Sequence, residues 1–275
     1  MTVERRRPTH GTVILIGGSE DKEGARLILT EVVRRAGGGP LVVATLASEV
    51  PDAQWERYHR VFRDLGVTAL RHLAVQDREE LVDADPSAIL DDAAAVFFTG
   101  GDQVKIATKL GGTPLFDKLR DRFKRGMLIA GTSAGASAMG EAMLVARGLE
   151  EPTHKVDGAF YMTRGLGLVA ELIIDQHFAQ RARIERLIGA IAENPGVLGI
   201  GIDEDTGVVL EPDRRFTVMG RGAVYVADGY GITHTNVSEK SGGQTLSLFD
   251  VRLHVLNHGT GFDLGSRRPF KATHE

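Results

Sequence analysis

The chain has 275 residues, of which 42% are hydrophobic and 25% charged, with a formal net charge of −4. This length and composition are typical of a globular protein with a large core, and the slight acidity gives no electrostatic case for nucleic acid as the main partner. The absence of cysteine excludes disulfides, a thiolate nucleophile and thiolate metal ligands, so covalent catalysis would have to use an oxygen or an amine.

Short apolar runs alternate with helical patterns over the first half of the chain. The predicted strands are Thr12–Ile16, Leu41–Leu46, Val67–Val75, Ala94–Phe98 and Met127–Ala130, and the predicted helices between them are Glu23–Arg35, Ala53–Leu65, Val104–Leu110 and Leu115–Lys124. This alternation predicts a mainly parallel sheet with helices on both faces, a three-layer αβα sandwich. The glycine-rich strand exits at Gly17, Gly100 and Gly131 should face one crevice, because ligands bind at the carboxyl ends of such strands.

The pattern changes from about Gly196, where short strands follow one another with few helices between them. They are Val197–Ile202, Val208–Leu210, Phe216–Met219, Val224–Val226 and Leu246–Leu256. We expect antiparallel strands that extend or flank the same sheet within one domain, residues 1–275. The ends, about 1–10 and 265–275, are expected to be flexible.

Targeting and membrane signals are not evident in the sequence. No apolar run approaches the roughly 18 residues needed to span a bilayer, and the polar first residues lack the apolar core of a signal peptide. We therefore expect a cytoplasmic protein with no membrane or nucleic-acid partner.

Ser133 lies in Gly131-Thr-Ser-Ala-Gly135, a G-x-S-x-G pattern that follows the predicted strand Met127–Ala130. A serine at a sharp strand-to-helix turn exposes its hydroxyl, and the two glycines lack the Cβ atoms that would clash there. The alternative is a tight connection made of small residues. The preceding strand favours Ser133 as a nucleophile.

His177 is the leading candidate for the base that such a serine needs. It ends Leu172–Phe178, where a buried strand turns abruptly polar through Asp175 and Gln176, a set that is costly to bury without a purpose. The alternative is that Asp175 caps the next helix and His177 packs beside it. Of the other histidines, His254 and His258 are four residues apart, but a strand would separate them and no third ligand is evident, so no metal is expected.

An acid that orients the histidine is expected from Asp203-Glu204-Asp205, which directly follows an apolar strand. Asp157 is the main competitor, since it lies between the serine and the histidine in the chain. The acidic cluster could equally be an exposed turn.

Arg181, Arg183 and Arg186 follow His177 on a predicted helix. Such arginines are usually a solvated face, but beside the base they are suited to bind carboxylates in bidentate geometry. The Gly17-Gly18-Ser19-Glu20 turn lacks the residues of a phosphate-binding loop, and its acids would repel a phosphate.

Together these segments, with Thr99-Gly-Gly-Asp-Gln103, resemble the cyanophycinase family over residues 10 to 260. These are serine peptidases related to aspartyl dipeptidase E, on a fold like that of class I glutamine amidotransferases, which is flavodoxin-like. The run Asp175-Gln-His-Phe with its three arginines is the most specific part of the resemblance.

The resemblance implies a catalytic triad and a substrate site in this sequence. The implied residues are Ser133 as nucleophile, His177 as base, Glu204 as acid, Gly101 and Ala134 for the oxyanion, and Gln103, Asp175, Gln176, Arg181, Arg183 and Arg186 for substrate. Cyanophycin is a polyaspartate with arginine on each β-carboxyl, and the family releases β-aspartyl-arginine dipeptides from its end. Asp175 would then pair with a substrate guanidinium and the arginines with carboxylates.

The resemblance also implies a homodimer and no cofactor. Two alternatives stay open at this stage. One is a dipeptidase for α-aspartyl peptides, and the other is an inactive relative that binds peptides. The choice between arginine and lysine in the substrate is also open.

Overall fold

The computed structural model describes residues 11–146, 160–238 and 245–272. The apolar runs of the first half form parallel strands of one sheet: β1 (Val13–Ile16), β2 (Leu41–Ala44), β3 (Leu70–Leu73), β4 (Ala95–Phe98) and β5 (Leu128–Thr132). The sheet continues on the other side of β1 through antiparallel strands β10 (Thr206–Leu210), β11 (Arg215–Gly220), β16 (Thr260–Asp263) and β17 (Arg268–Lys271). Its order is β17-β16-β11-β10-β1-β5-β4-β2-β3.

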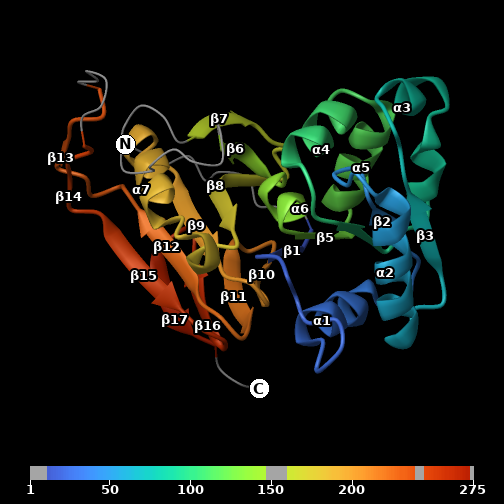
Figure 1. Ribbon diagram of the computed structural model, residues 1–275. Coiled ribbons are helices and arrows are strands. Elements are labelled where there is room, and N and C mark those ends of the chain that lie inside the picture. Colours follow the sequence, from blue (N-terminus) through green and yellow to red (C-terminus); the bar gives the residue numbers. More distant parts are fainter. Residues whose placement is uncertain (1–10, 147–159, 239–244, 273–275) are drawn as a thin grey trace.

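A second sheet packs beside the first (Figure 1) and has the order β15-β12-β9-β8-β6-β7. Its strands are β6 (Gly140–Ala146), β7 (Phe160–Arg164), β8 (Val169–Gln176), β9 (Leu198–Ile202), β12 (Val224–Asp228) and β15 (Arg252–Leu256). Only the β6–β8 and β8–β9 pairs in it are parallel. A small pair, β13 (His234–Thr235) and β14 (Leu248–Phe249), stands apart.

The predicted α/β class is confirmed, but the expectation of one mainly parallel sheet is not, because the strands form two separate mixed sheets. Of the C-terminal strands expected to extend or flank this sheet in antiparallel order, β10 and β11 extend it, whereas β9, β12 and β15 belong to the second sheet, which flanks it, and β9 pairs with β8 in parallel. Part of the end predicted to be flexible is strand β17. The expectation for residues 1–10 lies outside the described residues.

Helices cover the sheets because their apolar residues fall on one stripe. The helical segments are α1 (Leu27–Ala36), α2 (Pro51–Asp64), α3 (Glu79–Asp83), η1 (Pro86–Leu90), α4 (Gln103–Leu110), α5 (Pro114–Lys124), α6 (Ala134–Ser137), η2 (Ala179–Arg181) and α7 (Ile184–Glu193). Helices α1 and α2 pack on one face of the first sheet, whereas α4, α5 and the second sheet pack on the other. Helix α7 covers the outer face of the second sheet.

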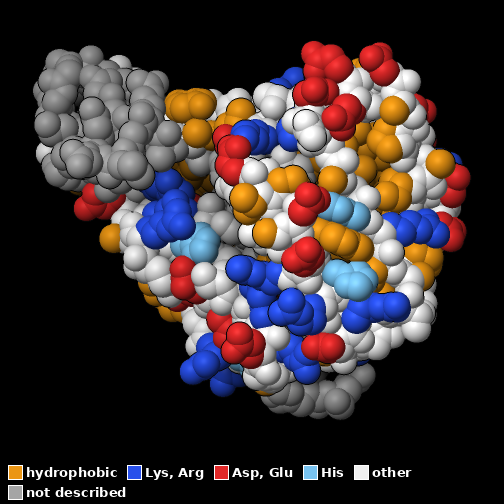
Figure 2. Space-filling view, turned by 45° about the vertical axis from the view of Figure 1, so that its right-hand side comes forward, with side chains coloured by type: hydrophobic (Ala, Val, Ile, Leu, Met, Phe, Trp, Pro, Cys, Tyr) orange, Lys and Arg blue, Asp and Glu red, His pale blue; other side chains and the backbone are white. Residues whose placement is uncertain are grey.

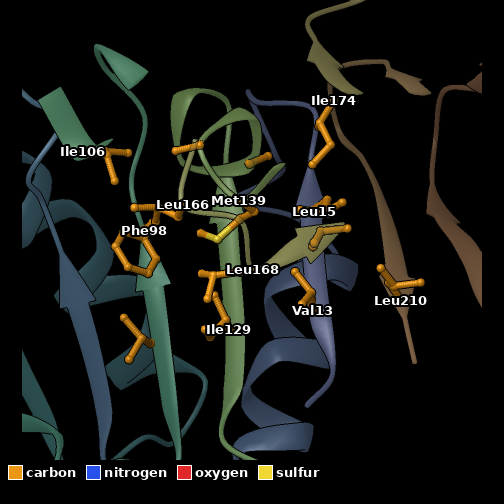
Figure 3. Close-up of a cluster of buried hydrophobic side chains, with 14 of the residues drawn as sticks. Val13, Leu15, Phe98, Ile106, Ile129, Met139, Leu166, Leu168, Ile174 and Leu210 are labelled. Atoms are coloured by element: carbon orange, nitrogen blue, oxygen red, sulfur yellow. The ribbon is translucent and has the colours of Figure 1, made fainter. Parts of the chain in front are cut away.

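Strand β1 shows why the first sheet is buried on both faces. All four of its residues are inaccessible to solvent, and successive side chains point to opposite sides. Ile14 and Ile16 join the cluster under α1 and α2, whereas Val13 and Leu15 join the cluster between the two sheets. Figure 3 shows Leu15 in this second cluster with Phe98 and Ile174. The carboxyl end of β1 is thus held rigidly next to the end of β5.

Candidate active site

Ser133 follows β5 directly and precedes the short helix α6, as the G-x-S-x-G pattern predicts. Its backbone is in an unusual conformation, φ 53° and ψ −117°. A Cβ atom on Gly131 would lie 2.5 Å from the backbone of Gly135, and one on Gly135 would lie 2.4 Å from the Phe98 carbonyl oxygen. Both glycines are therefore needed for the turn that presents the serine.

The three side chains Ser133, His177 and Glu204 form a hydrogen-bonded series. Ser133 Oγ lies 2.9 Å from His177 Nε2, and His177 Nδ1 lies 2.6 Å from Glu204 Oε1. Ser133 comes from the first sheet, His177 follows β8 of the second, and Glu204 lies in the crossover from β9 to β10. The competitor Asp157 lies outside the described residues.

The Gly17-Gly18 turn supports the imidazole, a role that the sequence analysis missed. The backbone N–H of His177 donates to the Gly17 carbonyl oxygen at 2.8 Å. Gly18 has φ +100°, and a Cβ atom there would lie 2.4 Å from His177 Nε2. This close approach requires glycine, and the signal in the sequence was the pair of glycines at a strand exit.

The three acidic residues after β9 have different hydrogen-bond partners. Asp203 is buried and accepts the N–H groups of Ala179 and Ala223 at 2.9 and 3.0 Å. The Asp205 carboxylate accepts the N–H of Asp21 at 2.8 Å. Glu204 alone contacts the histidine, so the cluster is not simply an exposed turn.

Burial lowers the pKa of His177 below its ordinary value of 6.5, and the nearby positive charges of Arg181 and Arg183 act in the same direction. The hydrogen bond and charge of Glu204 oppose this shift without cancelling it. At neutral pH the imidazole is therefore neutral and able to accept a proton from the serine hydroxyl.

The predicted oxyanion groups lie beside Ser133. Ala134 is the next residue, and a Cβ atom on Gly100 would lie 3.3 Å from Ser133 Cβ. Gly101 has φ +142°, and a Cβ atom there would lie 2.1 Å from the Ala47 carbonyl oxygen. Within the residues that the structure describes, neither the Gly101 nor the Ala134 N–H donates a hydrogen bond, which leaves both available to a ligand.

Of the two glutamines predicted to bind substrate, Gln176 lies near the serine. The Gln176 side-chain oxygen lies 3.5 Å from Ser133 Oγ. Gln103, at the start of α4, donates its side-chain amide to the Leu144 carbonyl oxygen at 2.8 Å. Arg181 is exposed.

Arg183 is half-buried, and its guanidinium donates to the Gln176 carbonyl oxygen and, at 3.2 Å, to Asp175 Oδ1. Burial lowers the pKa of Arg183 to about 10, against the attraction of Asp175, so the group stays charged at neutral pH. A partly desolvated guanidinium is well suited to bind a carboxylate.

Asp175 and Arg186 form a buried pair and do not line the site. Asp175 is 1% and Arg186 6% exposed, and Arg186 Nε donates to Asp175 Oδ2 at 2.6 Å while its Nη2 donates to Oδ1. The expectation that Asp175 pairs with a substrate guanidinium is not met, because its carboxylate is already engaged by two arginines. The same burial removes Arg186 from direct contact with a ligand.

We expect Asp175→Asn to lower the free energy of unfolding by about 3–5 kcal/mol, because it leaves the buried Arg186 without a compensating charge. Urea unfolding measures this loss. Asp92→Asn is the matched control, since its pair with Arg71 is exposed and should contribute less than about 1 kcal/mol. Equal losses in the two variants would contradict the role of Asp175.

A serine, a histidine and a carboxylate joined in this way on an α/β fold define a site of the serine-hydrolase type. The comparisons agree with this class. The chain belongs to peptidase family S51, whose family model matches residues 13–218.

Curated relatives share most of this chain. It is 39% identical to the cyanophycinase of Nostoc sp. strain PCC 7120, over 99% of this chain and 93% of the relative. It is 37% identical to the cyanophycinase of Geminocystis herdmanii, over 94% of this chain and 95% of that protein. The crystal structure of a peptidase from an acI-B1 Actinobacterium has the same fold, with a TM-score of 0.68, 21% identity, and coverage of 94% of this chain and 99% of its own.

A membrane-spanning helix is not found among the described residues, since none of their helices has the required length and apolarity.

Proposed function

We propose that this protein is a serine exopeptidase that hydrolyses cyanophycin to β-aspartyl-arginine dipeptides. The observation that carries the proposal is the hydrogen-bonded series Ser133–His177–Glu204, in a chain 39% identical over nearly its full length to curated cyanophycinases. The series supports acyl-enzyme chemistry, and the relatives' names indicate the polymer.

In the first step, Ser133 Oγ attacks the scissile carbonyl carbon while His177 Nε2 accepts the hydroxyl proton. Glu204 keeps the other ring nitrogen protonated, fixes the orientation of the ring and stabilises the imidazolium. The Gly101 and Ala134 N–H groups would donate to the oxygen on which negative charge develops. These donors act where charge appears only in the transition state, which lowers the barrier.

The second step breaks the amide bond. The His177 imidazolium gives its proton to the leaving backbone nitrogen, and the acyl part of the substrate stays attached to Ser133 as an ester. His177 then takes a proton from water, the resulting hydroxide attacks the ester, and the proton returns to Ser133. The acyl part then leaves as a free carboxylate.

The polar groups around Ser133 would bind the substrate. Each unit of the polymer offers a free arginine carboxylate and a guanidinium. Arg183 and Arg181 would bind the carboxylate, whereas Gln103 and Gln176 offer uncharged groups for the peptide and the guanidinium. Asp175 and Arg186 act through Arg183, whose position they fix.

The test is digestion of purified cyanophycin by the wild-type protein, with the products identified by mass. We expect β-aspartyl-arginine as the main product, and parallel assays on lysine-containing polymer measure the side-chain preference. Hydrolysis of α-aspartyl dipeptides with no release from the polymer would overturn the proposal in favour of a dipeptidase. Failure of a fluorophosphonate to label Ser133 would indicate an inactive relative.

Three further proposals rest on the family resemblance. They are a homodimer, a cytoplasmic location and kinship of the β3-β2-β4-β5-β1 part with the flavodoxin-like fold of class I glutamine amidotransferases. The five parallel strands with helices on both faces support the last of these. Light scattering tests the first, with twice the chain mass of 29.7 kDa expected.

A further inference from the structure

A basic groove lies between the loop that joins β1 to α1 and the outer surface of α2. We define the basic groove by Lys22, Arg26, Arg57 and Arg60, with Glu23 and Asp64 at its sides. Its volume of about 670 Å³ falls within the range of about 300–1,000 Å³ that is typical of ligand sites. Figure 2 shows Lys and Arg side chains gathered low on the face formed by α1 and α2.

The cations of the groove are only partly neutralised. Lys22 Nζ lies 2.9 Å from Glu20 Oε1, and Arg26 reaches Asp64 only at 3.9 Å. The side chains of Arg57 and Arg60 are exposed, and no hydrogen bond or ion pair joins them to another described residue. Two guanidinium groups are therefore available to a carboxylate ligand, next to two carboxylates that could accept a cation.

Asp21 holds the backbone of the loop that forms one side of the groove. Its carboxylate accepts the backbone N–H groups of Arg26, Gly24 and Glu23, at 2.9, 2.8 and 3.0 Å. These bonds, that of Arg26 first, lower the pKa of Asp21 to about 2, so the carboxylate is ionised at neutral pH and accepts all three bonds. Lys22 and Arg26 are thus presented from a fixed backbone.

Buried side chains link the groove to the strand that carries the nucleophile. Glu20 is buried and accepts the Thr132 hydroxyl at 2.6 Å through Oε2, while its Oε1 contacts Lys22. Thr132 immediately precedes Ser133 in β5. Two side-chain contacts therefore join Lys22 of the groove to the residue next to the serine.

We propose that the basic groove binds the part of the cyanophycin chain that extends beyond the dipeptide being cleaved. This inference rests on the proposed function. Every polymer unit carries one free carboxylate and one guanidinium, and the groove offers four cations and two carboxylates in one depression. Lys22 of the groove is linked through Glu20 to Thr132, the residue before Ser133. The groove would hold a long chain through several weak contacts, and a short substrate would not reach it.

The experiment compares Arg57→Ala/Arg60→Ala with wild type on long polymer and on a substrate of two β-aspartyl-arginine units. We expect the ratio of the KM for polymer to the KM for the two-unit substrate to rise by about fivefold at low ionic strength, and the difference to shrink in high salt. Arg120→Ala/Arg125→Ala is the matched control. It also removes two exposed arginines, but near α5 on the opposite face of the first sheet, and its ratio should equal that of wild type.

A second measurement uses Ser133→Ala versions of all three proteins in co-sedimentation with insoluble cyanophycin. Weaker retention of the groove variant than of the control supports the proposal. Equal retention with an unchanged KM ratio overturns it, as does an equal loss on both substrates. If wild type releases no dipeptide from the polymer, the proposed function itself fails, which is distinguishable from failure of the groove alone.

Discussion

Ser133→Ala is expected to reduce kcat on cyanophycin by about 10⁴–10⁶-fold, because the attacking oxygen is removed while the remainder of the site persists. The substitution deletes one oxygen and keeps the turn, so circular dichroism and the unfolding midpoint should match those of wild type. Mass spectrometry of the dipeptides released under single-turnover conditions measures the fall in rate.

Ser137→Ala is the control for this prediction. Ser137 belongs to the same small-residue segment, but its hydroxyl donates to the Ile174 carbonyl oxygen at 3.2 Å and not to His177. Its replacement should lower stability by about 1 kcal/mol and leave turnover almost unchanged. Retained turnover in Ser133→Ala would remove the serine from the mechanism.

Glu204→Gln is the second change with a large expected effect, a fall in kcat of about 10³–10⁴-fold. The glutamine amide cannot stabilise the imidazolium, and it favours the wrong ring tautomer. In wild type, burial lowers the pKa of His177 and Glu204 partly restores it. Because a protonated base is inactive, the acid limb of kcat/KM should lie below pH 6.5 in wild type and move to still lower pH in the variant.

The pH profile distinguishes this role from a structural one. Asp205→Asn, which alters the neighbouring carboxylate that contacts the Asp21 N–H, should leave the acid limb in place. A Glu204→Gln variant that loses rate with an unmoved limb, or whose limb moves to higher pH, would argue against the assigned contact.

The parts of the site that could be predicted are those with a strong local signal. The turn around Ser133 requires glycine on both sides, and an abrupt Asp-Gln-His sequence at the end of an apolar strand predicted a buried polar cluster at His177. Both features are encoded within a few residues. The strands of the first sheet were predictable for the same reason.

The division into two sheets was not predictable, because the apolar pattern of β9 does not specify which strands it pairs with. The orientation of the Asp175 side chain could not be predicted from the sequence either. Alternation along a strand would place Asp175 and His177 on one face, but the positive φ of His177, +47°, breaks the alternation. The imidazole therefore contacts Ser133, whereas the Asp175 carboxylate contacts Arg186. Glu20 and Gly18 act through contacts with residues more than 100 positions away, which no local pattern reveals.

The nucleophile and its base come from different sheets, and this has a consequence for how the enzyme would fail. A small slip between the two sheets would lengthen the 2.9 Å contact from Ser133 to His177 while each sheet kept its own hydrogen bonds. Turnover would then disappear on heating before the secondary structure melts. The reaction rate in such a protein reports how closely its two sheets pack on each other. Ligands or mutations that improve packing in the core between the sheets would raise the temperature at which activity is lost, without changing the residues of the site.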